Sequence, residues 1–90
     1  MLTKAHAERI AKKLNASIRP KGAHDLAIVE YNNKRIVQFG IRRGSRDDLG
    51  HDHLPGDLHL SPHDTMELAR CPISRDEWIQ RMKDKGLISD

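Results

Sequence analysis

The sequence has little cysteine, few aromatic residues and no long apolar segment. Its single cysteine, Cys71, excludes an internal disulfide, which favours a reducing compartment such as the cytoplasm. No apolar run approaches the roughly 20 residues that span a bilayer, and the first 14 residues are too highly charged for a signal peptide. Because only three of the 90 residues are aromatic, aliphatic side chains must supply most of the core. We therefore expect one small, soluble, cytoplasmic domain over residues 1–90.

Charge is distributed unevenly along the chain. Residues 1–46 hold eleven Lys and Arg against three Asp and Glu, a net charge of +8. Residues 47–90 hold five Lys and Arg against ten Asp and Glu, a net charge of −5. A segment with such an excess of positive charge attracts polyanions, of which phosphate backbones are the commonest. The alternative is a dipolar, solvated surface that has no ligand.

The apolar pattern of the first half predicts one helix followed by three strands. Apolar residues at helical spacing follow Thr3, which is a suitable N-cap. They are Ala7, Ile10, Ala11 and Leu14. Pro20 ends the first β-rich segment, because proline cannot donate to a sheet ladder. Residues 32–34 form a turn between the second and third segments, since asparagine tolerates positive φ. The expected strands span residues 17–19, 26–31 and 35–41.

The second half predicts a long irregular loop and two further helices. Residues 42–60 contain breakers and little periodicity, although residues 58–60 alternate as in a short fourth strand. Ser61 precedes a proline and an acid, and Ser74 with Glu77 forms a full capping box in which Glu77 reaches back to the Ser74 backbone. The expected fold is α+β, of α-β-β-β-α type. It has a three-stranded antiparallel sheet, helices packed on one face and an extra C-terminal helix.

Two short segments carry a family resemblance. Lys21-Gly22-Ala23-His24 opens a strand, and Lys85-Gly86-Leu87-Ile88 ends the last helix. In this order they resemble the HicA family of toxin ribonucleases, whose fold is similar to a double-stranded-RNA-binding domain. That family commonly has serine where Ala23 stands, and the 42–60 loop is longer than its usual connection. The resemblance implies an mRNA-cleaving toxin that an antitoxin protein holds inactive, with His24 as the active histidine.

His24 is the main catalytic candidate on chemical grounds as well. RNA can be cleaved without a metal when a base removes the 2′-hydroxyl proton, and histidine titrates near neutral pH. Nearby cations would stabilise the charge on phosphorus. The expected phosphate contacts are Lys21, Arg35, Arg42, Arg43 and Arg46. In the alternative, His24 is an ordinary surface residue, and the same cations serve a non-catalytic module that binds nucleic acid or another partner.

A second histidine-rich group lies in the expected loop. His51, Asp52 and His53 form a further candidate site for catalysis or RNA contact, in which Asp52 accepts a ring N–H. Histidines at this spacing can also bind zinc, which is a third possibility for His51, His53, His59 and His63. No C-x-x-C or H-E-x-x-H motif is present, so the prediction assigns no metal and no cofactor. The expected partners are RNA and an antitoxin, not a membrane, and the oligomeric state is left open.

Overall fold

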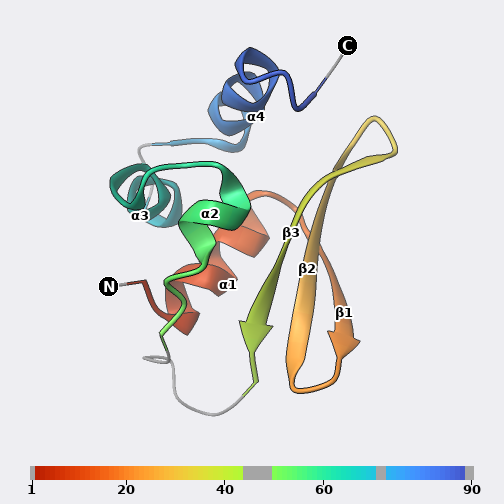
Figure 1. Cartoon of the computed structure of the whole chain (residues 1–90), viewed down its shortest axis with the longest axis vertical. Coiled ribbons are helices and arrows are strands. Elements are labelled where there is room, and N and C mark those ends of the chain that lie inside the picture. Colours follow the sequence, from red (N-terminus) through yellow and green to blue (C-terminus); the bar gives the residue numbers. More distant parts are fainter. Residues whose placement is uncertain (1, 44–49, 71–72, 89–90) are drawn as a thin grey trace.

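A three-stranded antiparallel sheet and four helices make up the part of the chain that the computed structural model describes, residues 2–43, 50–70 and 73–88 (Figure 1). In chain order the elements are α1 (Lys4–Lys13), β1 (Ser17–Lys21), β2 (His24–Tyr31), β3 (Lys34–Arg42), α2 (Leu54–Leu58), α3 (Pro62–Arg70) and α4 (Arg75–Asp84). The expected α+β class is therefore confirmed. None of the helices within these residues is long and apolar enough to cross a membrane.

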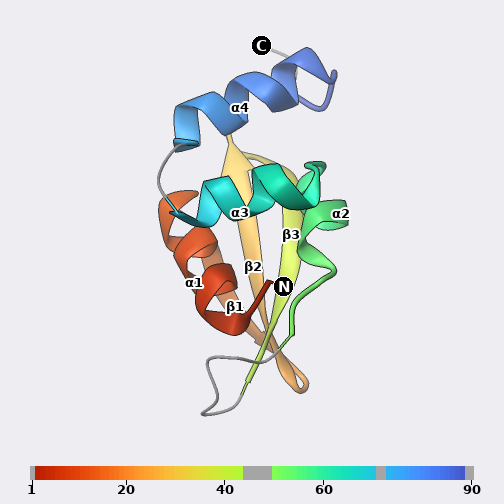
Figure 2. The same cartoon turned by 90° about the vertical axis from the view of Figure 1, so that its left-hand side faces the viewer.

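The helices gather on one side of the sheet. Helices α1, α2 and α3 lie over one face, and α4 lies at the end that carries the β2–β3 turn (Figures 1 and 2). The core lies between these layers and takes apolar side chains from all four helices and from β2 and β3. It includes the predicted stripe of α1, whose members Ala7, Ile10, Ala11 and Leu14 are all buried. No described element covers the opposite face of the sheet in these views.

The register of the central strand β2 decides which side chains reach the core. Val29 pairs with Val37, and Ala27 pairs with Phe39. All four side chains are buried, because alternate residues of each strand face the core. The hairpin closes over Asn32–Asn33, whose φ angles of 53° and 65° suit asparagine. The turn is one residue shorter than expected, because β3 already begins at the next residue.

The first strand continues past the proline that was expected to end it. β1 extends to Lys21, and Pro20 pairs with Asp25 of β2. The expectation was wrong because β1 is an edge strand, where a residue without an N–H can face solvent. β2 likewise starts earlier than expected, at His24, so that this histidine belongs to the sheet.

Part of the expected irregular loop is helical. Leu54 and Leu58, one turn apart in α2, are both fully buried, and this burial outweighs the proline and glycine between them. A fourth strand at residues 58–60 is therefore wrong. His59 instead ends α2 in the left-handed conformation, with a φ of 57°. Residues 44–49 lie outside the described part of the chain.

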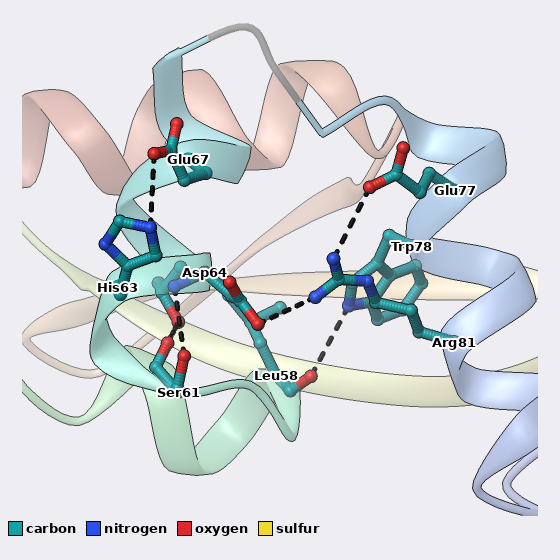
Figure 3. A network of polar contacts seen from close by, with 9 residues as sticks. Leu58, Ser61, His63, Asp64, Glu67, Glu77, Trp78 and Arg81 are labelled. Carbon is teal, nitrogen blue, oxygen red and sulfur yellow. Dashed lines mark hydrogen bonds and ion pairs between the residues drawn. The ribbon is translucent and has the colours of Figure 1, made fainter.

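Helix α4 begins at the predicted N-cap but forms only half of the predicted capping box. The Ser74 hydroxyl accepts a hydrogen bond from the Glu77 backbone N–H at 3.1 Å. The Glu77 carboxylate lies 3.5 Å from the Arg81 guanidinium, which competes with the Ser74 backbone for it. Arg81 also donates to Asp64 of α3 at 2.8 Å and so joins the two helices beside the buried Trp78 (Figure 3).

His6 takes part in the capping box at the N-terminus of α1, in the position that glutamate often occupies. The Thr3 backbone N–H donates to Nδ1 of His6, three residues further on, at 3.1 Å. This bond requires a lone pair on Nδ1 and therefore the neutral ring. Burial lowers the pKa of His6 below its ordinary value of 6.5, and the nearby charges of Arg9 and Arg70 lower it further.

His6 should therefore make stability fall as the solution is acidified. The unfolded chain takes up its proton near pH 6.5, before the folded chain does, so the unfolded state binds more protons between the two pKa values. The His6 contribution is complete above 6.5 and is lost as pH falls through the lower, folded pKa. Urea denaturation at several pH values measures it.

The control is His6→Gln, which keeps an acceptor for the Thr3 N–H but does not titrate. Its unfolding free energy should depend less on pH than that of the wild type. The exposed His63, changed to Gln, should leave the wild-type dependence in place. Identical pH dependence in the wild type and His6→Gln would contradict this assignment.

Candidate functional site

The uncovered face of the sheet carries most of the predicted basic residues. Because Ala27, Val29 and Phe39 face the core, the residues next to them in sequence face the other way. We call this surface the open face. Its members include Arg19, Lys21, His24, Leu26, Ile28, Glu30, Arg35, Gln38, Gly40 and Arg42. It thus holds four cationic residues against one acid, together with a histidine.

Three predicted site residues form one row across the sheet. His24 pairs with Lys21 of β1 on one side and with Arg42 of β3 on the other. Paired residues on one sheet face have Cβ atoms roughly 4.5–5.5 Å apart, so these three side chains are neighbours. All three are exposed. In the described part of the chain, neither the His24 ring nor the Arg42 guanidinium has a hydrogen-bond or ion-pair partner, so both are free to meet a ligand.

The row borders a shallow cavity of about 410 Å³. Its lining residues are Lys21, His24, Leu26, Gly40, Arg42 and His53. Gly40 forms the floor beside His24, because a Cβ atom there would lie 3.7 Å from the His24 ring. His53 enters from the segment before α2, and its Nε2–H donates to the Gly40 carbonyl at 2.9 Å. The cavity therefore has a histidine on either side of one glycine and a cation on each outer strand next to His24.

The second candidate group does not form one site: His51 and Asp52 bind backbone N–H groups, and His53 lines the cavity. Nε2 of His51 accepts from the Arg42 backbone N–H at 3.0 Å, and this ring is fully buried. The Asp52 carboxylate accepts from the Leu2 backbone N–H at 3.3 Å. Only His53 reaches the cavity. Its proximity to His24 could not be predicted from the sequence, because their approach depends on how the chain returns along β3.

His51 and His53 satisfy two backbone groups on the outer edge of β3. An edge strand leaves every second residue with an unpaired N–H and C=O. Here the Arg42 N–H is satisfied by His51 and the Gly40 C=O by His53. His51 must be neutral and protonated on Nδ1 to accept this bond. The two rings are 5.5 Å apart between centroids, and both contact the backbone of β3 near its end.

The remaining predicted phosphate contacts lie elsewhere. Arg43 donates to Asp25 at 2.9 Å, and Asp25 pairs with Ile41 on the helix-covered side. Arg35 is on the open face but at its far end, where it donates to Gln38. Arg46 lies outside the described residues. Adjacent arginines in the sequence thus face opposite sides of the sheet.

The other histidines lie apart from one another on α2 and α3. The His63 ring lies 3.3 Å from the Glu67 carboxylate on α3. His59 ends α2 and is exposed. Within residues 2–43, 50–70 and 73–88, no three His, Cys, Asp or Glu residues are placed to hold a metal ion. These residues therefore give no support for the zinc alternative.

No protein-family model matches this chain, and comparison with curated proteins and with solved structures gives no significant match. The geometry of the open face is therefore the evidence from which a function can be proposed.

His51→Ala should destabilise the protein by roughly 1–3 kcal/mol, because it leaves the Arg42 N–H without its acceptor and removes a fully buried side chain. His51→Gln can place an amide oxygen near the same N–H and should recover part of this loss. The exposed His63, changed to Ala, is the control and should change little. Urea denaturation midpoints measure all three, and a His51→Ala midpoint equal to that of the wild type would contradict the edge-completing role.

Proposed function

We propose that this chain is an RNA-directed protein that binds the phosphodiester backbone on its open face. The observation that carries the proposal is the row of Lys21, His24 and Arg42 beside the 410 Å³ cavity. Two cations on separate strands can contact phosphate oxygens on both sides of the histidine. The cavity is shallow, which suits a polymer that passes across the face.

Charge and composition favour contact with the backbone over contact with the bases. The open face has four cations and only Glu30 as an acid, so its potential attracts phosphates. The three aromatic residues of the chain are elsewhere: Phe39 and Trp78 are buried, and Tyr31 faces the helix side. Base stacking is therefore unsupported, and recognition of a duplex by its backbone fits better. The α1-β1-β2-β3 order, with helices on one face, supports a fold like that of double-stranded-RNA-binding domains.

The resemblance to HicA toxins extends this proposal to mRNA cleavage, with His24 as a general acid or base and an antitoxin as the protein partner. The support is the exposed His24 ring, which lies next to two cations and has no hydrogen-bond partner among the described residues. The rival is a binding module that uses the same cations without chemistry. Loss of cleavage in His24→Ala, with RNA binding retained, would favour the enzyme. A wild-type protein that binds RNA and leaves it intact would favour the module.

Binding should depend steeply on salt, and the two adjacent arginines should differ in their effect. Log affinity falls with log salt by about 0.7–0.9 for each neutralised phosphate. Arg42→Ala should flatten this slope by about one unit, because its guanidinium faces the open side and pairs with none of the described residues. Arg43→Ala also removes one positive charge, but Arg43 forms an ion pair with Asp25 on the helix-covered side of the sheet. The slope of log affinity against log salt for this variant should therefore stay near that of the wild type.

Fluorescence anisotropy with a short RNA duplex, from about 50 to about 200 mM salt, measures these slopes. The Arg43 variant controls for the general loss of one positive charge. Equal flattening by both substitutions would show that net charge alone acts. An affinity that is indifferent to salt would contradict phosphate binding.

A further inference from the structure

The cavity on the open face is lined by a second histidine, His53, which the sequence analysis assigned to a different group from His24. The two rings flank Gly40: His24 lies 3.7 Å from where a Cβ of that glycine would be, and His53 donates to its carbonyl. Both rings line the same cavity, together with Lys21 and Arg42. Cleavage of RNA through its 2′-hydroxyl requires two proton transfers. A base takes the proton of the attacking 2′-hydroxyl, and an acid gives a proton to the leaving oxygen.

The contact with Gly40 fixes which nitrogen of His53 is available. A carbonyl oxygen can only accept, so Nε2 carries the proton in that bond. Nδ1 is then the nitrogen that gains or loses a proton, and the bond to Gly40 survives in both states. The exposed His53 ring can therefore act as an acid without leaving its position. The His51 ring cannot act as the acid in the same way, because it is buried and its Nε2 accepts a hydrogen bond.

We infer that His24 and His53 form a general base and general acid pair for RNA cleavage, with His53 as the catalytic acid. This inference rests on the proposed function and specifies its chemistry. The substrate class is RNA with an intact 2′-hydroxyl next to the cleaved phosphate; DNA is bound but not cut. Lys21 and Arg42 hold the non-bridging oxygens of that phosphate.

The reaction balances without a metal or a second reactant. The neutral His24 ring takes the proton of the 2′-hydroxyl as its oxygen attacks phosphorus. The bond between phosphorus and the 5′-oxygen breaks, and that oxygen takes the Nδ1 proton of His53. The products are a 2′,3′-cyclic phosphate and a free 5′-hydroxyl. His24 ends protonated and His53 neutral, and exchange of protons with water restores both.

The experiment compares His53→Gln and His24→Gln with the wild type on two RNA substrates. Glutamine at position 53 can still donate to the Gly40 carbonyl but cannot supply a proton. The first substrate is an ordinary RNA whose cleavage position has been mapped with the wild type. The second has sulfur in place of the bridging 5′-oxygen at that position, and its thiolate leaving group does not need an acid. Thermal melts confirm that each variant is folded, and His63→Gln is the histidine control.

On ordinary RNA, each cavity variant should be about 10²–10⁴-fold slower than the wild type, the usual effect of losing a proton-transfer group. On the sulfur substrate, His53→Gln should approach the wild-type rate while His24→Gln remains slow. His63→Gln should match the wild type on both substrates. A merely structural role for His53 would slow both substrates equally.

Three further outcomes would overturn the inference, and they separate it from the proposed function. If the wild type binds RNA but does not cleave it, RNA binding stands and the acid–base pair is wrong. If His53→Gln cleaves ordinary RNA at the wild-type rate, cleavage by His24 stands and His53 is not the acid. If the wild type fails to bind RNA at all, the proposed function falls as well.

Discussion

The edge of β3 is the constraint on which the rest of the structure depends. A sheet of three strands leaves two edges, and the N–H of Arg42 and the carbonyl of Gly40 lie on one of them. Two histidine side chains satisfy these groups in place of a fourth strand. The same contacts hold the segment before α2 against the sheet, so that Leu54 can enter the core. They also bring His53 into the cavity beside His24. The need to satisfy two backbone groups at the edge of β3 thus determines both that Leu54 packs in the core and that His53 lines the cavity.

Alternation along the strands explains why charge gathers on the open face. Arg42 and Arg43 are neighbours in sequence, yet Asp25 holds the second on the helix-covered side. The first remains in the row with His24. The size of the chain matters too, because a domain of 90 residues buries too little surface to enclose a deep pocket. A sheet face with a shallow cavity is a surface that suits the polymeric ligand we propose.

The sequence predicted those features that local chemistry determines. The apolar stripe of α1, the asparagine turn and the Ser74 cap are each set by a few consecutive residues, and each was confirmed. The path through α2 was not predictable in this way, since its leucines become helical only because the core receives them. Pro20 shows the same limit: whether proline ends a strand depends on whether that strand is at an edge.

Of the candidate site, the residues brought together by the hairpins were predictable, and the position of His53 was not. Lys21, His24 and Arg42 meet because hairpin register follows from short turns, which the sequence indicates. His53 was assigned to a separate group because its contact with Gly40 spans thirteen residues and depends on the return of the chain along β3. The histidine-x-histidine spacing marks the two residues as a candidate group but does not indicate that they contact β3.

The most direct measurement of the central claim is an NMR titration of isotope-labelled protein with a short RNA duplex. The open face should be the binding surface, so the largest shifts should be those of the Lys21, His24 and Arg42 amides and the His53 ring. Residues of α3 and α4 such as Glu67 should change little. Shifts concentrated instead on Arg9 and Lys12, which are exposed on α1, would show that RNA binds the helical side and would contradict the account.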